Sequence, residues 1–323
     1  MNGDCTSPEI KLKMRVKPCL VIAVLAFSGA AQARADAEFY VDPESGPALW
    51  ARAHSNDPRA ARIAESIANV PMARWFGNWS GDVRAAVNRF TGKANAADRK
   101  PILVAYNIPN RDCGGASAGG IADASAYRVW MDSFARGVGN RRALVIVEPD
   151  STAELDCLKT DDKRDERLGL LRYAVSRFRL NAPDADVYLD GGNAHWISAT
   201  VMATRLNAAG LSDAKGFAVN VSNFYTTEES MAYANSVNAA LAQQFGYTKP
   251  FAIDTSRNGN GSDGHWCNPA GRKIGAPTGA ASDTMLPVWI KVPGDSDGAC
   301  GSAPATPAGT FSPELAVRLI DGD

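Results

Sequence analysis

Carboxylate residues follow the apolar segments of this chain again and again. The run at 143–147 contains only Ala, Leu, Val and Ile, and Glu148, Pro149 and Asp150 come directly after it. Such a run is typical of a buried parallel strand that ends at a turn. Other apolar runs lead in the same way to Asp112, Asp190, Asp254, Asp295 and Asp297. Because all strand carboxyl ends of a β/α barrel open onto the face that carries the active site, the pattern predicts acid–base catalysis in a cleft lined with carboxylates.

The elements expected to position these residues are strands and helices in alternation. Apolar runs that predict strands lie near residues 73–76, 102–106, 144–147, 187–189, 217–221, 251–253 and 288–290. Amphipathic stretches that predict helices, the first with Asp57 as its N-cap, lie at 58–69, 123–138, 161–181, 195–209, 227–245 and 313–320. Alternation of this kind requires a parallel sheet with helices outside it. About seven strands are expected, one fewer than in a regular eightfold barrel.

The composition is that of an ordinary globular protein. The chain has 323 residues, of which 45% are hydrophobic and 21% charged, which is enough for one substantial core. Its net charge is −1, and it would be about −4 without the basic N-terminal segment. This balance gives no electrostatic attraction to nucleic acid or to anionic membranes. A neutral partner is therefore expected.

The N-terminus has the pattern of a secretory signal. Basic residues between positions 11 and 17 precede an apolar segment at 19–27 that is too short to span a bilayer comfortably. Small residues follow it. We therefore expect residues 1–35 to be a signal peptide and residues 36–323 to form a single catalytic domain, exported to the periplasm or the medium with no membrane anchor. An N-terminal membrane anchor is the alternative interpretation.

Cysteines beyond the expected signal are Cys113, Cys157, Cys267 and Cys300. An even number of cysteines in an exported protein predicts two disulfides. We expect the pairs nearest in sequence, Cys113 with Cys157 and Cys267 with Cys300. Zinc binding is the competing interpretation. The chain has no Cys-x-x-Cys pair, however, and only three histidines, which lack the spacing of metal ligands. Each cysteine adjoins a strand-end loop, so the bridges would hold those loops in place.

Ordered motifs cover nearly all of the chain after the expected signal. They are Tyr-x-x-x-x-Arg-Asp-Cys at 106–113, Glu-Pro-Asp-Ser at 148–151, Asp-Gly-Gly-Asn-Ala-His-Trp at 190–196, Trp-Cys-Asn at 266–268 and Lys-Val-Pro-Gly-Asp-Ser-Asp-Gly at 291–298. In this order, with the cysteines beside them, they resemble glycoside hydrolase family 6, the inverting cellulases. The resemblance implies an α/β fold, a distorted, roughly seven-stranded parallel β/α barrel with an open active-site cleft.

The resemblance also implies distinct roles for the carboxylates. An inverting glycosidase needs a protonated carboxyl at the glycosidic oxygen and an ionised carboxylate that positions water on the opposite face of the sugar. By resemblance Asp150 is the general acid, Asp112 raises its pKa, Tyr106 lies under the reacting sugar and Asp297 is the base. The alternatives are structural, with Asp150 as a helix N-cap and Asp297 as a turn residue in a Gly-rich loop.

Further matches to the family indicate sugar contacts. Aromatic rings stack on the apolar faces of sugars, and the matching residues are Trp75 and Trp266 on the non-reducing side and Trp196 on the reducing side. The matching polar residues are Asp190, Asn223, Lys291 and Asp295. Asp295 is one methylene shorter than the usual Glu, and Asn193, unlike the usual His, cannot carry charge. The other tryptophans, expected in the core, are Trp50, Trp79, Trp130 and Trp289.

The activity implied by the resemblance is that of a secreted endo-β-1,4-glucanase. Such an enzyme hydrolyses internal bonds of cellulose with inversion, and we expect it to act as a monomer without cofactor or metal. Cellobiohydrolases of the same family carry long loops that roof the cleft, and a mature chain of roughly 290 residues leaves little room for them. A cellobiohydrolase is one alternative. A non-catalytic glucan-binding protein on the same barrel is the other.

Overall fold

The computed structural model describes residues 1, 3, 38–279, 282 and 284–323. Apart from positions 1 and 3, the predicted signal peptide lies outside the described residues, and so does its boundary with the rest of the chain. Within the described part of the chain, no helix combines the length and the apolarity that crossing a membrane requires.

Seven parallel strands form one sheet in sequence order. They are β1 (Arg74–Phe76), β2 (Ile102–Ala105), β3 (Ala143–Val147), β4 (Ala185–Asp190), β5 (Gly216–Val219), β6 (Phe251–Asp254) and β7 (Met285–Val288). The sheet curls until its edges approach each other, and Met72 beside β1 pairs with Trp289 beside β7 in an isolated parallel bridge. We call this contact the seam. The predicted distorted barrel of seven strands is confirmed.

Alternate side chains of each strand enter two different cores, as the pleat of a strand requires. In β2, Ile102 and Val104 belong to the inner core of the barrel, together with Ile146 of β3. Leu103 and Ala105 belong to the larger core between the sheet and its helices. All of them are buried, which explains why β2 and β3 are apolar throughout and show no polar alternation.

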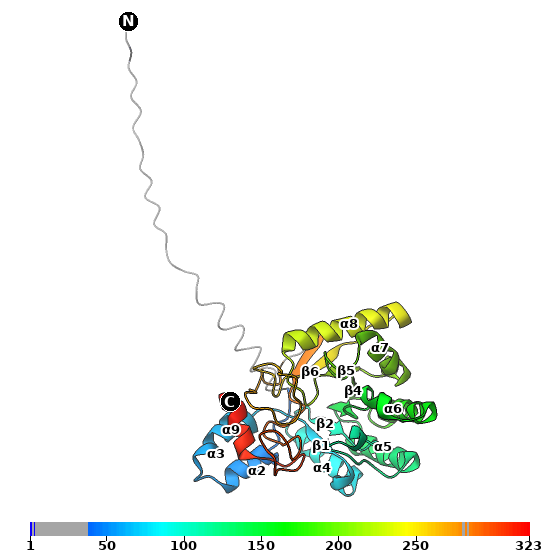
Figure 1. Cartoon of the computed structure of the whole chain (residues 1–323), viewed down its shortest axis with the longest axis horizontal. Coiled ribbons are helices and arrows are strands. Elements are labelled where there is room, and N and C mark those ends of the chain that lie inside the picture. Colours follow the sequence, from blue (N-terminus) through cyan, green and yellow to red (C-terminus); the bar gives the residue numbers. More distant parts are fainter. Residues whose placement is uncertain (2, 4–37, 280–281, 283) are drawn as a thin grey trace.

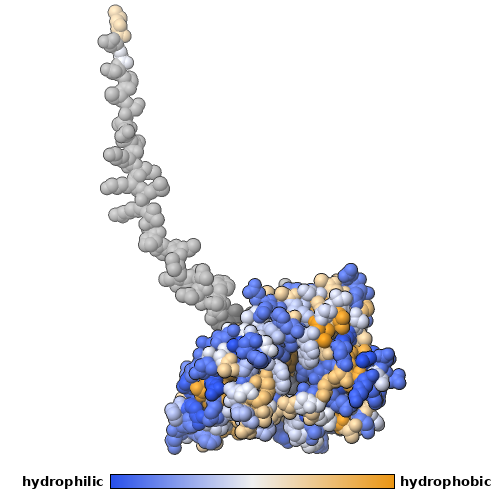
Figure 2. Space-filling view, viewed as in Figure 1, coloured by the Kyte–Doolittle hydropathy of each residue, from blue (hydrophilic) through white to orange (hydrophobic). Residues whose placement is uncertain are grey.

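One set of helices covers the outside of the sheet (Figure 1). It consists of α4 (Val83–Ala96), α5 (Ala124–Val138), α6 (Asp161–Asn181), α7 (Ala199–Ala208) and α8 (Thr227–Phe245). Side-chain caps begin several of them: Asp82 accepts a hydrogen bond from Ala85 N at 3.0 Å, and Thr226 and Glu229 form a capping box on α8. The surface in Figure 2 is largely hydrophilic, as expected where the polar faces of amphipathic helices meet water.

A second set of helices packs over the seam, on the other side of the molecule (Figure 1). It consists of α2 (Gly46–Ala53), α3 (Pro58–Ile63), which continues as a π-helical turn (Ala64–Ala68), and α9 (Pro313–Asp321). Asp57 caps α3 as predicted, accepting a hydrogen bond from Arg59 N at 2.9 Å. Arg59 also pairs with Glu314 of α9 at 2.6 Å. Trp289, only 1% exposed, packs in the centre of this group.

Several elements differ from the sequence-based expectations. The patterns miss α2 and α4, and Gly92 inside α4 is a residue that usually argues against a helix interior. The helix expected at 195–209 begins only after its N-cap Ser198, because the preceding residues belong to a loop. β7 ends at Val288, where the predicted strand began. The prediction was shifted because Pro287 resembles a strand terminator, although proline is tolerated at a sheet edge.

Short 3₁₀ turns complete the described elements. They are η2 (Asn78–Ser80), η3 (Asp112–Gly114), η4 (Ala153–Cys157) and η5 (Leu211–Asp213).

Candidate active site

A cleft of about 1030 Å³ is lined by loops that follow the strands at their carboxyl ends. Almost all of the predicted site residues meet there: Trp75, Tyr106, Asp112, Asp150, Trp196, Asn223, Trp266, Lys291, Asp295 and Asp297. The lining does not include Asp190 or Asp254. Loops far apart in the sequence therefore converge on one face, as the barrel argument requires.

The backbone at two strand ends is bent into the left-handed region. φ is 49° at Glu148, 71° at Asp150 and 56° at Asp112, values that residues other than glycine rarely adopt. Such conformations persist only where the surroundings hold them, and they cluster at functional sites. The buried Glu148 supplies part of this hold, because its Oε2 accepts hydrogen bonds from Asn107 N at 2.8 Å and Ile108 N at 3.0 Å. The end of β3 is thereby tied to the loop after β2.

Asp150 lies among other carboxyl groups. Its backbone N donates to Asp190 Oδ2 at 2.9 Å, and Gly192 N donates to the same oxygen at 3.2 Å. Asp190 is only 1% exposed and is not among the residues that line the cleft. Burial, followed by the charges of Asp190, Glu154 and Asp112, raises the pKa of Asp150 well above its ordinary value. A carboxyl that keeps its proton in this way is suited to general-acid chemistry.

Asp112 reaches the same side of the cleft from η3. Its Oδ2 accepts a hydrogen bond from Ser117 N at 2.5 Å, and burial raises its pKa. A disulfide joins Cys113 to Cys157, with their Cα atoms 6.2 Å apart, and so fastens η3 to η4. The loop after β2 is thus held against the loop after β3. We call Asp112, Asp150, Glu154 and Asp190 the acid side of the cleft.

Glu154 is a cleft residue that the sequence reasoning missed. It lies in η4, where its backbone N donates to Asp150 O at 2.8 Å. Its Oε2 is buried without a hydrogen-bond partner among the described residues. Burial, followed by the charge of Asp112, raises the pKa of Glu154 to about 7. The available signal was a second carboxylate only four residues beyond Asp150, before the next predicted helix.

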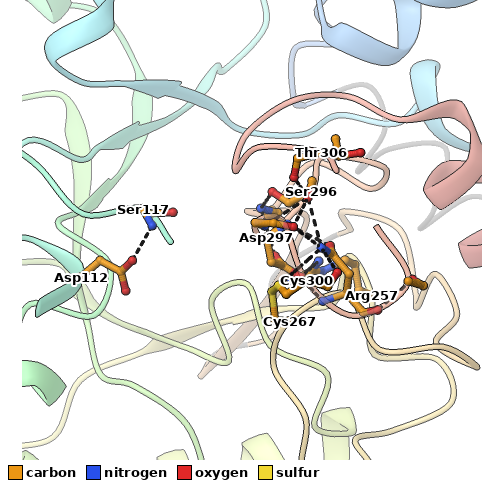
Figure 3. The surroundings of a disulfide bond; sticks show 12 residues. Asp112, Ser117, Arg257, Cys267, Ser296, Asp297, Cys300 and Thr306 are labelled. Atoms are coloured by element: carbon orange, nitrogen blue, oxygen red, sulfur yellow. Dashed lines mark hydrogen bonds and ion pairs between the residues drawn. A yellow bond between two sulfur atoms is a disulfide. The ribbon is translucent and has the colours of Figure 1, made fainter. Parts of the chain in front are cut away.

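Asp297 lies well apart from Asp112, beside Arg257 (Figure 3). Its Oδ2 is 2.8 Å from Arg257 Nη1, and its Oδ1 is 3.2 Å from Lys291 Nζ. Asn268 N also donates to Oδ2 at 3.1 Å. Burial alone would raise the pKa of Asp297, but the charges of Arg257 and Lys291 outweigh it, with help from these hydrogen bonds, and the pKa lies below its ordinary value. We call Asp297, Arg257 and Lys291 the base side.

The loop that carries Asp297 is held by Asn268 and by the second disulfide, which Figure 3 shows beside Asp297. Asn268 Oδ1 accepts from Asp297 N at 2.9 Å, and its Nδ2 donates to Gly298 O at 2.8 Å. Cys267 is bonded to Cys300, with their Cα atoms 6.0 Å apart. Both predicted disulfide pairings are therefore confirmed, and each side of the cleft has one bridge.

Asp254 was expected to bring a further carboxylate into the cleft, and that expectation is wrong. It is fully buried and accepts hydrogen bonds from Ser222 N at 2.9 Å, Ser256 N at 3.0 Å and Lys291 N at 3.0 Å. Its carboxylate thus ties together the loops after β5, β6 and β7. Asp295, in contrast, lines the cleft, and burial raises its pKa to about 7.

The predicted aromatic platforms differ in their exposure. Trp196 is 43% exposed and Trp266 56%, so both rings are accessible from the cleft. Trp75 is half-buried, and its Nε1 donates to Ile290 O at 2.8 Å. Its ring meets Tyr106 edge-on, with centroids 5.2 Å apart and planes at 88°. Trp75 and Tyr106 therefore form a continuous wall of the cleft.

The tryptophans expected in the core divide into two groups. Trp130 and Trp289 are buried, as expected, and Trp50 is half-buried against Phe311. Trp79 contradicts the expectation, because it is 55% exposed and lines the cleft. The sequence pattern could not separate these cases, since exposure depends on loops that pack only in the folded chain.

The position that departs from the family pattern, Asn193, makes a local contact. Asn193 is 7% exposed, and its Oδ1 accepts from His195 N at 3.1 Å. His195 also lines the cleft, beside Trp196, and its Nε2 lies 3.6 Å from Glu229 Oε1. The amide thus shapes the loop that carries Trp196.

The sequence profile described as Glycosyl hydrolases family 6 matches residues 34–322. The chain belongs to glycosyl hydrolase family 6. Its relatives in this family include Endoglucanase 1 of Streptomyces halstedii, 52% identical over 88% of each chain. Endoglucanase A of Cellulomonas fimi is 43% identical over 87% of this chain, which spans only 60% of that relative.

Solved structures of family 6 share the fold. The endoglucanase Cel6 from Mycobacterium tuberculosis, in complex with methyl-cellobiosyl-4-deoxy-4-thio-β-D-cellobioside, is 41% identical with a TM-score of 0.82, covering 88% of this chain and 97% of that one. A cellobiohydrolase is more distant: 1,4-beta-D-glucan cellobiohydrolase C of Emericella nidulans is 30% identical over 80% of this chain and 70% of its own. Family 6 membership accounts for the order of the motifs and for the open ring of strands.

Proposed function

We propose that this protein is an inverting endo-1,4-β-glucanase. The observation that carries the proposal is one cleft with two opposed carboxyl environments. Burial and neighbouring carboxyls keep the pKa of Asp150 high, whereas Arg257 and Lys291 keep that of Asp297 low. An inverting glycosidase needs this pair of protonation states on opposite faces of one sugar.

In the proposed reaction Asp150 donates its proton to the glycosidic oxygen as the bond from C1 to that oxygen breaks. A water molecule attacks C1 from the opposite face, and Asp297 takes the proton that this water loses, directly or through a second water. The new C1–O bond therefore has inverted configuration. Tyr106 would support the reacting sugar, and Asp112 would help Asp150 to keep its proton until the bond breaks.

Two further observations support a glucan substrate and cleavage within the chain. Exposed Trp196 and Trp266 suit the apolar faces of glucose units, and Asn223, Lys291 and Asp295 supply polar contacts on the cleft wall. The relatives that share 41–52% identity are named endoglucanases, and that of M. tuberculosis was solved with a thio-cellooligosaccharide. The cellobiohydrolase relative is only 30% identical.

We also propose an exported, monomeric protein with one catalytic domain at 36–323. Two disulfides support export, because such bridges persist in oxidising compartments. The partner would be a β-1,4-glucan, and the proposed reaction uses neither nucleic acid nor cofactor.

Viscosity measurements on a soluble substituted cellulose test the proposal. An endoglucanase thins the solution quickly while it releases little reducing sugar. Slow thinning at the same sugar release would identify a cellobiohydrolase, and unchanged viscosity a binding protein. Proton NMR of the first products gives a second test, since inversion of a β-linkage must yield the α-anomer before mutarotation. An initial β-anomer would contradict the inverting mechanism.

A further inference from the structure

Trp79 is an exposed aromatic residue of the cleft to which the proposed mechanism gives no role. It lies in η2, the turn that follows β1, and 55% of its surface is exposed. A large ring left in water at the wall of a cleft is a feature of binding surfaces. The ring nevertheless has a defined position, because it packs against Gly77 and Arg111.

The backbone beneath the ring is shaped to receive it. A Cβ added at Gly77 would lie 2.4 Å from the Trp79 ring, so only glycine allows the indole to lie this close to the chain. Gly77 N also donates to Ser80 Oγ at 3.0 Å, which closes the turn around Trp79. The position of the indole is therefore set by its own turn.

Arg111 provides a second hold. Its guanidinium lies 5.0 Å from the Trp79 ring centroid and 4.7 Å from that of Tyr106. Arg111 is only 7% exposed, and it donates to Tyr106 O at 2.9 Å and to Ser117 O at 2.8 Å. Trp79 therefore rests on a buried cation that is anchored to the protein, and a ligand that stacks on the indole would have little side-chain motion to freeze.

These contacts connect Trp79 to Trp75 and Tyr106 along one wall of the cleft. Trp75 meets Tyr106, Tyr106 meets Arg111, and Arg111 meets Trp79. We propose that Trp79 is an additional sugar platform, which stacks on the apolar face of one glucose unit of a β-glucan bound in the cleft. The inference rests on the proposed function, and it adds a binding residue on the wall that Trp75 and Tyr106 begin.

Binding to a nearly inactive background tests this platform. The affinity for cellohexaose is measured by calorimetry in Asp150→Asn and in the same protein with Trp79→Ala. Loss of one stacking contact should weaken binding by about tenfold. Trp79→Phe should retain most of the affinity, because it keeps an aromatic face. Phe245→Ala is the matched control, since Phe245 is an exposed aromatic at the end of α8 and outside the cleft lining.

The possible outcomes separate this inference from the proposed function. Equal cellohexaose affinity of Asp150→Asn, the parent protein here, and of the same protein with Trp79→Ala would overturn the platform. The proposed function would remain in place in that case, provided that the unmodified enzyme hydrolyses the glucan. Trp79→Ala is also made in the otherwise unmodified enzyme, where kcat can be measured. A reduced kcat there, with unchanged cellohexaose affinity in the Asp150→Asn background, would also overturn the platform, because Trp79 would then act only as a support for Arg111. If the parent protein bound no cellooligosaccharide at all, the proposed function itself would fail. The thermal unfolding temperature of each variant, compared with that of Trp79→Phe, shows whether a variant has lost its fold.

Discussion

The acid side and the base side of the cleft place the same kind of side chain in opposite electrostatic surroundings. Asp150 and Asp297 are both aspartates on strand-end loops, and each loop is fastened by a disulfide. Asp150 has Asp190, Glu154 and Asp112 around it, and its pKa is raised. Asp297 has Arg257 and Lys291 within 3.2 Å, and its pKa is lowered.

Burial alone therefore does not decide which of the two carboxyls keeps its proton. Burial is the largest influence on both aspartates and raises the pKa in each case. The sign of the neighbouring charges makes the difference, since carboxylates reinforce the effect of burial and cations reverse it. Substitutions at Asp150, Asp297 and Glu154 each remove one charged or protonated group from one side of the cleft.

The largest effect is expected from Asp150→Asn. Loss of the general acid should reduce hydrolysis of cellulose by about 100- to 10,000-fold, because the leaving sugar then departs as an unprotonated alkoxide. Aryl cellobiosides with good leaving groups need less protonation and should lose much less. Parallel kcat/KM measurements on both substrates check this. Equal losses on the two would contradict the acid role.

Asp297→Asn should lower kcat by about 100-fold or more, because asparagine cannot take the proton of the attacking water. Binding of cellohexaose should remain, because the acid side and the tryptophans are unchanged. Azide added to the variant could enter where water attacks and form an α-glycosyl azide, detectable by mass spectrometry and NMR. Near-normal activity would make Asp297 a loop residue. A loss of affinity that matches the loss of rate would make it a substrate contact.

The smallest effect is expected from Glu154→Gln, which sharpens the comparison on the acid side. The pKa of Glu154 is raised to about 7, so above this pH the residue carries a negative charge that favours the protonated form of Asp150. Glutamine removes that charge, and the pKa of Asp150 falls. The alkaline limb of the kcat/KM profile should therefore move to lower pH, while activity well below pH 7 stays the same.

Asp156→Asn is the matched control for this shift. Asp156 lies in the same turn, but its side chain is 69% exposed and pairs with Arg205 at 2.5 Å. Its removal should leave the alkaline limb in place. An identical shift in both variants, or no shift in Glu154→Gln, would rule out a specific influence of Glu154 on the general acid.

The sequence predicted the strand-end aspartates, but it could not sort them. Asp112, Asp150 and Asp297 line the cleft as expected, because a branched apolar run followed by turn residues is a local signal. Asp190 and Asp254 have the same local pattern, yet their carboxylates turn toward backbone N–H groups of their own and of neighbouring loops. Which way such a side chain turns depends on the loop beside it, and that loop is distant in sequence.

The same reason explains the residues and elements that were missed or misplaced. Trp79 is exposed because Gly77 and Arg111 hold it at the wall, a contact that involves a loop after a different strand. β7 was shifted because Pro287 is acceptable only where a strand has one neighbour, and the edge of a sheet cannot be identified from one segment. Helix α6, in contrast, has the bounds expected from its own periodicity.

The seam between Met72 and Trp289 also sets the order in which the catalytic centre can be assembled. It joins the first strand to the last, and α9 near the end of the chain packs over it with α3 from near the beginning. Contacts between such distant residues form only after the intervening chain is present, and synthesis proceeds from the N-terminus. A growing chain that has reached α6 already contains Asp112, Asp150 and Glu154, but it contains none of Arg257, Lys291 and Asp297. The proposed acid is therefore synthesised well before the proposed base, and both sides of the cleft are present only once β7 and the loop after it have been made.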